Sequence, residues 1–226
     1  MVGELICVQG RGRGKAEPSS LGPLAAARWT VYVPEGLSPR RLARRLLRAE
    51  RGLAKLGAGR VVLRGGFPYG DRLRLLRPVD PLPLWRGLAA ELALGALERE
   101  GVPPGRGRVA LSAPRLCGEL TAAAERLCPL VRGLVIDAPG GEDYARSLQA
   151  RFGLPVTPSA AGADVTAAFG PGGGRWGRCL ELHGAVDLGG LTVGAAGLEL
   201  PEDCADQVLA LLWEQGLVKR EGLAIR

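Results

Sequence analysis

Residues 108–156 read RVALSAPRLCGELTAAAERLCPLVRGLVIDAPGGEDYARSLQARFGLPV. Short β-rich apolar runs alternate in this stretch with segments whose apolar residues recur at helical spacing. Such alternation at close spacing is typical of parallel strands joined by right-handed helical crossovers. The stretch therefore predicts half of a parallel α/β sheet, with strands at 109–111, 134–137 and near Val156 and helices over 119–130 and 142–152.

Two further β-rich runs precede this stretch, WTVYV at 29–33 and RVVL at 60–63. Between them, Ser38 is a suitable N-cap and Pro39 suits the first position of a helix. The apolar residues that follow recur on one face as far as Leu56, which predicts an amphipathic helix packed on the sheet. With these runs included, the chain supplies about five parallel strands.

The remaining segments complete the predicted fold class, which is a Rossmann-like, mostly parallel α/β sheet flanked by helices. Residues 10–27 are rich in Gly, Pro and Ser and have no hydrophobic period, so they predict a mobile loop. Residues 164–183 predict an antiparallel hairpin around the loop GPGGGRWG, with Trp176 folded back over the sheet. A C-terminal helix is expected to open at Pro201.

The charge is unevenly distributed along the chain. Residues 1–106 carry 19 Lys and Arg against 9 Asp and Glu, whereas residues 107–226 carry 11 against 14. We expect one α/β domain over residues 1–226, with residues 101–107 as the candidate point of subdivision into a basic half and a Rossmann-like half. The arginine-rich composition also fits a bacterial genome of high GC content, so the basic balance alone predicts only non-specific attraction to anions.

At the level of architecture, residues 108–169 resemble a dinucleotide-binding Rossmann domain and, distantly, the cofactor domain of shikimate-dehydrogenase-type enzymes. The resemblance implies an acidic residue at the end of the second strand, where Asp137 stands. It also implies a glycine-rich turn after the first strand, where this sequence has Ser112, Pro114 and Cys117. Because Pro114 has no N–H and a fixed φ, we expect no dinucleotide cofactor. Ser112 and Asp137 remain candidates for holding a smaller nucleotide or anion.

The predicted helix over residues 40–55 carries the candidate polyanion contacts. Arg40, Arg44, Arg48 and Arg51 recur along it on one side, away from the apolar face. They are candidates for gripping phosphates or an acidic partner, although the helix interleaves no aromatic side chains for base stacking. The alternative is a solvated basic face with no ligand.

Catalytic and metal sites are not predicted. Cys179, Glu181 and His183 alternate along one strand face, but no second cluster of metal ligands accompanies them. The glycine pattern at residues 172–177 lacks the helix that a nucleotide-binding turn requires. The five scattered cysteines and the lack of a long apolar run or signal peptide favour a cytoplasmic protein.

These patterns predict a non-catalytic binding or scaffolding module without a cofactor. Its partner, a small molecule or another protein, is not identified, and no membrane association is expected. The first alternative is a nucleotide- or anion-binding enzyme that uses the carboxyl ends of its strands at Ser112 and Asp137, where open parallel sheets bind ligands. The second is nucleic-acid binding through the arginine-rich helix 40–55.

Overall fold

The computed structural model describes residues 1–153, 155–157 and 162–226. The chain forms two compact units: unit 1 is Met1–Pro81 with Ala195–Gly222, and unit 2 is Leu82–Gly194 with Leu223–Arg226. Residues 101–107, the candidate point of subdivision, lie inside unit 2. The expected mixed α/β class is confirmed, with the strands of the two units in separate five-stranded sheets.

The sheet of unit 1 is mostly parallel. Across the sheet its strands are β2 (Ala16–Leu21), β3 (Leu24–Val33), β1 (Val2–Gln9), β4 (Arg60–Leu63) and β5 (Arg77–Pro78). Only the edge pair β2 and β3 is antiparallel. The mobile loop expected over residues 10–27 is therefore wrong for residues 16–27, which form a hairpin. Because an edge strand is exposed over much of its length, β2 shows little hydrophobic periodicity.

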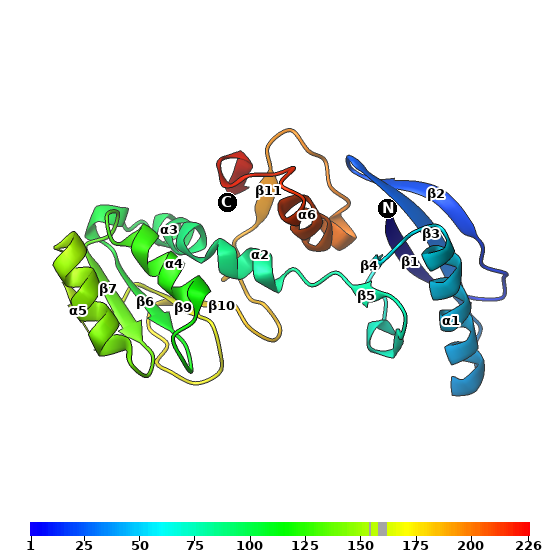
Figure 1. Ribbon diagram of the computed structural model, residues 1–226, viewed down its shortest axis with the longest axis horizontal. Helices are drawn as coiled ribbons and strands as arrows, with labels where there is room; N and C mark the ends of the chain where they lie inside the picture. Colours follow the sequence, from blue (N-terminus) through cyan, green and yellow to red (C-terminus); the bar gives the residue numbers. More distant parts are fainter. Residues whose placement is uncertain (154, 158–161) are drawn as a thin grey trace. The chain divides into compact units, whose positions relative to one another are not determined.

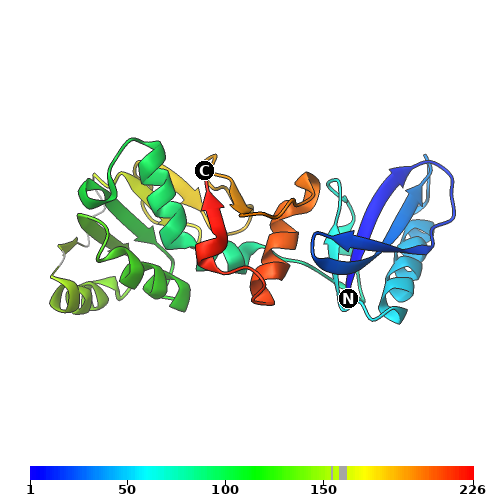
Figure 2. The same ribbon diagram turned by 90° about the horizontal axis from the view of Figure 1, so that it is seen from above.

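Helix α1 (Pro39–Lys55) covers one face of this sheet in both views (Figures 1 and 2). It begins directly after the N-cap Ser38, as the sequence predicts. Leu42, Leu46 and Leu53 are buried in a cluster with residues of β1, β3 and β4. The burial of these side chains against the sheet supplies most of the stability of such a helix.

Helix α1 also buries one charged side chain, Glu50, which the periodicity does not predict. Its Oε1 accepts the backbone N–H groups of Arg74, Leu75 and Leu76 at 2.8, 2.7 and 3.0 Å. A carboxylate that accepts several backbone N–H groups compensates for its own burial. This interaction fixes the irregular segment between β4 and β5, which contains the short helix η1 (Gly70–Arg72).

Residues 195–222 belong to unit 1, although they follow nearly all of unit 2 in the sequence. They contain η3 (Glu202–Cys204), α6 (Ala205–Glu214) and η4 (Arg220–Gly222). The side-chain amide of Gln207 accepts the N–H of Leu63 at 3.0 Å and donates to the Leu63 carbonyl at 3.1 Å. Gln207 thus provides hydrogen-bond partners for the backbone N–H and C=O of the last residue of β4, as a neighbouring strand would.

A buried carboxylate, Glu4, organises the charged side chains of unit 1. Glu4 is fully buried on the central strand β1. It accepts hydrogen bonds from Ser19 Oγ at 2.7 Å, from Arg28 Nε at 2.9 Å and from Arg64 Nη1 at 2.6 Å. Arg64 also pairs with Asp203 of η3 through Nε at 2.7 Å. The network therefore connects four strands or strand ends with the returning segment.

Unit 2 contains a parallel sheet of the kind that the sequence predicts. Across the sheet its strands are β8 (Val156–Thr157), β7 (Gly133–Asp137), β6 (Arg108–Ser112), β9 (Val165–Ala168) and β10 (Arg178–Glu181). All four neighbouring pairs are parallel. Counted along the chain the order is 3-2-1-4-5, which is compatible with a Rossmann-like fold.

The helices of unit 2 match the predicted β-α rhythm. They are α2 (Leu82–Gly87), α3 (Ala89–Arg99), the short η2 (Pro104–Arg106), α4 (Gly118–Leu127) and α5 (Gly141–Phe152). Helix α5 packs on β7 and β8, while α3 packs on β9 and β10 and contacts α4. No helix in the described part of the chain is long and apolar enough to span a membrane.

The antiparallel hairpin expected over residues 164–183 is wrong in its location, because β9 and β10 are parallel. A glycine-rich loop between two short strands resembles a hairpin locally, but the pairing of β9 with β6 fixes its direction. The C-terminal antiparallel pair consists of β11 (Val193–Ala195) and β12 (Leu223–Ile225). Beside it, Thr192 and Arg226 exchange backbone hydrogen bonds of 2.8 and 2.9 Å.

We predict that Glu4→Gln lowers the free energy of unfolding by roughly 1.5–3 kcal/mol at neutral pH, because it removes a charged acceptor of four hydrogen bonds from three side chains. Burial alone would raise the pKa of Glu4, but the hydrogen bonds from Arg28, Ser19 and Arg64 outweigh it and hold the pKa below 4.5. Because the folded pKa is depressed, the carboxylate stabilises the fold above about pH 4.5, and this contribution is lost as the pH falls through the folded pKa.

Urea denaturation followed by circular dichroism between pH 3 and 7 measures this effect. The matched control is Glu17→Gln on the neighbouring strand β2, where the carboxylate is 55% exposed beside Lys15 and is expected to contribute little. Equal effects of the two substitutions, or a loss in Glu4→Gln that does not shrink at acid pH, would contradict the prediction.

Candidate functional site

The structure brings Ser112 and Asp137 together, as the strand pattern predicts. They are paired residues at the carboxyl ends of the adjacent strands β6 and β7. The hydroxyl of the fully buried Ser112 donates to Asp137 Oδ2 at 3.0 Å. In parallel sheets of this order, ligands bind beyond these strand ends, so this edge of the sheet is a candidate binding site.

A glycine-rich loop of the same unit lies on these strand ends. The N–H of Gly174 donates to Asp137 Oδ2 at 2.9 Å. A Cβ atom placed on Gly173 would lie 2.0 Å from Ser112 Oγ, and one placed on Gly170 would lie 2.4 Å from Pro114 Cδ. Only glycine lets the loop approach this closely. The backbone of residues 170–174 therefore occupies the space next to Ser112 and Asp137.

Trp176 anchors the end of this loop. The N–H of Trp176 donates to Thr166 Oγ1 at 3.0 Å, and the Thr166 hydroxyl donates back to the Trp176 carbonyl at 2.8 Å. The indole packs against Ala110, Val135 and Ala163. The expectation that Trp176 folds back over the sheet is confirmed, and it helps to hold the loop on the strand ends.

Polar side chains of β10, and His183 just after its end, gather around the carboxylate of Glu181. The Cys179 thiol donates to Oε1 at 3.4 Å, and His183 Nε2 lies 2.8 Å from Oε2. Arg175 hydrogen-bonds this carboxylate and holds the pKa of Glu181 down to about 2, while burial raises the pKa of Cys179 to about 11. The described residues include no group of three side chains arranged to hold a metal ion.

The four predicted polyanion contacts, Arg40, Arg44, Arg48 and Arg51, are all exposed on α1. At 3.6 residues per turn they fall within an arc of about 80° on the side opposite the buried leucines. None of them forms an ion pair with a carboxylate in the described part of the chain. In contrast, exposed arginines of unit 2 such as Arg126, Arg146 and Arg151 are each paired with an acidic side chain. We call the side of α1 that carries Arg40, Arg44, Arg48 and Arg51 the basic face.

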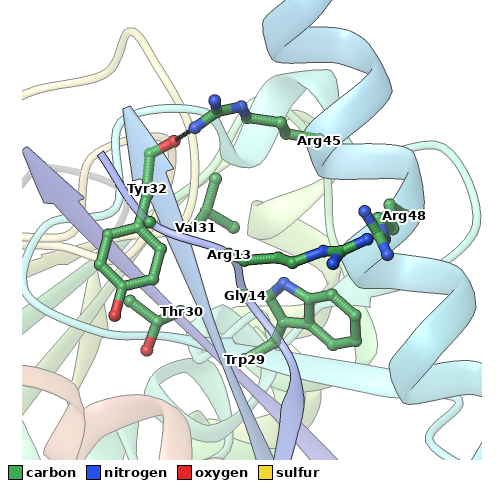
Figure 3. Close-up of a pocket in the computed structure, with 9 residues that line it drawn as sticks. Arg13, Gly14, Trp29, Thr30, Val31, Tyr32, Arg45 and Arg48 are labelled. Carbon is green, nitrogen blue, oxygen red and sulfur yellow. Dashed lines mark hydrogen bonds between the residues drawn. The ribbon is translucent and has the colours of Figure 1, made fainter. Parts of the chain in front are cut away.

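Two adjoining depressions follow the basic face. The first has a volume of about 210 Å³ and is drawn in Figure 3; the second has a volume of about 400 Å³. Trp29 of β3 and Arg48 of α1 line both. The first is also lined by Gly12, Arg13, Gly14, Thr30, Val31, Tyr32 and Arg45, and the second by Arg44, Leu47, Arg51, Gly52 and Lys55.

Close backbone contacts fix the indole of Trp29 between these depressions. A Cβ atom on Gly52 of α1 would lie 2.1 Å from Trp29 Cζ3, and a Cβ atom on Gly14 would lie 2.4 Å from Trp29 Nε1. Both positions thus require glycine. The sequence could not reveal this aromatic side chain beside the basic face, because it comes from a strand and not from the helix.

The segment of residues 10–15, GRGRGK, borders the first depression, and we call it the strap. Its glycines alternate with basic residues. Gly12 lies so close to the ring of Tyr32 that a Cβ atom would be 2.6 Å from Tyr32 Cγ. Arg13 lines the depression, and its neighbour Arg11 is exposed outside the lining. The glycines of the strap thus serve backbone packing on β3.

The close fit of the loop on Ser112 gives a test that uses two neighbouring glycines. Gly172 and Gly173 have the same φ of 82°, but a Cβ atom on Gly172 would have no neighbour within 4 Å. We predict that both alanine substitutions cost the strain of a left-handed backbone, about 1–2 kcal/mol, and that Gly173→Ala costs roughly a further 1–3 kcal/mol for overpacking against Ser112. Urea denaturation of the two variants measures the difference, and equal stabilities would show that the loop does not lie on Ser112.

A comparison of the chain with models of known protein families gives no match, and a comparison with curated protein sequences gives no significant match either. Two places remain as candidate sites: the covered strand ends of unit 2, and the basic face of unit 1, whose arginines have no ion-pair partner among the described residues.

Proposed function

We propose that the protein is a binding module for nucleic acid and that the basic face of α1 contacts the phosphates. The observation that carries this proposal is the row formed by Arg40, Arg44, Arg48 and Arg51, all exposed and without an ion-pair partner among the described residues. Arginine on a helix presents a planar fork of donors that matches phosphate oxygens.

The energetic basis of such binding is the release of counterions. A phosphate backbone carries condensed cations, and each arginine that replaces one of them releases it to the solvent. The positions of Arg44, Arg48 and Arg51 place these charges on successive turns of α1, so an extended anion meets several of them at once. The adjoining depressions give such a ligand a concave surface beside the helix.

The covered strand ends of unit 2 support a binding role over the enzymatic alternative. A nucleotide beyond Ser112 and Asp137 would have to displace the loop of residues 170–174 and break the hydrogen bond from Gly174 to Asp137. The Ser112 hydroxyl is already committed to the same carboxylate. We therefore assign unit 2 a scaffolding role in this proposal.

The test is the combined substitution Arg44→Ala, Arg48→Ala and Arg51→Ala, which keeps good helix-forming residues in α1. We expect the affinity for labelled DNA or RNA to fall by about 10-fold or more at low salt. The slope of log affinity against log salt should fall by about 0.7–0.9 for each lost phosphate contact. Fluorescence anisotropy titrations at several salt concentrations measure both quantities.

A matched control removes the same formal charge from exposed helical positions of unit 2, through Arg126→Ala, Arg146→Ala and Arg151→Ala. Because these arginines are paired with Glu91, Asp143 and Glu125, the control should keep the salt slope of the original protein. The proposal is wrong if the original protein binds neither DNA nor RNA at low salt, or if both triple variants lose affinity equally.

A further inference from the structure

We infer that the nucleic acid is single-stranded, with one base stacked on Trp29 and an adjacent phosphate held between Arg13 and Arg48. This inference rests on the proposed function and specifies its ligand. It depends on the indole beside the basic face, on two arginine side chains that converge there, and on the size of the first depression.

The indole of Trp29 is half-buried, and its accessible part borders both depressions together with Arg48. The backbones at Gly14 and Gly52 hold the ring in place. An aromatic face stacks on any unpaired base. In a duplex the bases are already paired and stacked, so their faces are not available to a side chain in such a depression. An aromatic ring set among cations therefore selects a single strand.

Two arginines from different elements converge beside the indole. Figure 3 shows the side chains of Arg13, from the strap, and Arg48, from α1, pointing toward one another. Neither has a carboxylate partner in the described residues. Arg45 donates to the carbonyl of Tyr32, drawn as a dashed line in Figure 3, which fixes a third guanidinium nearby. Like charges that converge repel one another, and a phosphate between them would relieve this repulsion.

The dimensions favour a piece of a polymer over a free cofactor. The first depression, at about 210 Å³, is smaller than the roughly 300–1,000 Å³ of sites for whole small-molecule ligands. It suits one base or one phosphate. The neighbouring depression, at about 400 Å³, continues along Arg44, Arg51 and Lys55, where the next phosphates of a strand would lie.

The experiment compares labelled oligo(dT) with the same strand annealed to oligo(dA), by fluorescence anisotropy at fixed salt. We expect the full-length protein to prefer the single strand. Trp29→Leu should weaken single-strand binding by about 5-fold to 100-fold, the range for loss of one stacked base, and leave duplex binding unchanged. Arg13→Ala should weaken single-strand binding further than Arg11→Ala, which removes the same charge from the strap outside the depression.

A second readout does not depend on the folding of the leucine variant. Oligo(dT) should quench the tryptophan fluorescence of the original protein and of Trp213→Phe, but much less that of Trp29→Phe. Equal affinity for single strand and duplex, with no effect of Trp29→Leu and no quenching assigned to Trp29, would overturn the inference and leave the proposed function standing. Absence of any nucleic-acid binding, or stronger binding to heparin or anionic vesicles, would overturn both.

Discussion

Unit 1 depends on the neutralisation of one buried carboxylate. Glu4 lies on the central strand, where an unpaired charge would cost several kcal/mol, so the closed sheet requires its partners. Those partners come from the hairpin strands, from the end of β4 and, through Arg64, from Asp203 near α6. The same charge thus fixes the sheet and recruits the returning segment.

In both units, glycine residues let the backbone pack directly against a side chain. In unit 2, glycines let a loop lie directly on Ser112 and Asp137, and in unit 1 Gly14 and Gly52 let the backbone lie against the indole of Trp29. These two contacts have different consequences for ligand binding. In the first case the chain covers a position where parallel sheets of this order hold ligands. In the second it holds a half-buried aromatic ring beside arginines that have no ion-pair partner among the described residues.

Sequence patterns predict the parts of the structure that depend on residues close together in the chain. The strands and helices of residues 108–156, and the start of α1 after Ser38, follow from periodicity and capping chemistry. The pairing of Ser112 with Asp137 follows from adjacent parallel strands. The basic face was predicted residue by residue, because Arg40, Arg44, Arg48 and Arg51 lie on one helix.

Contacts between distant residues set the features that the sequence could not reveal. The hairpin of β2 and β3 is stabilised in part by Ser19 and Arg28 meeting Glu4, and the direction of β10 by its pairing with β9. The burial of Glu50 depends on the backbone of residues 74–76, and Trp29 meets Arg48 only once β3 and α1 are packed. The division of the strands into two five-stranded sheets, in place of one, likewise follows from strand pairing that no local period encodes.

The return of residues 195–222 to unit 1 has a consequence for biosynthesis. A chain emerging from the ribosome presents β1 to β5 long before Asp203 and Gln207 exist, so Arg64 and the end of β4 stay without their final partners while unit 2 is made. Unit 2 has nearly all of its residues by then and can fold first. Most of unit 2 is therefore made before unit 1 is complete, and until residues 195–222 emerge a nascent chain carries its basic helix on an unfinished sheet.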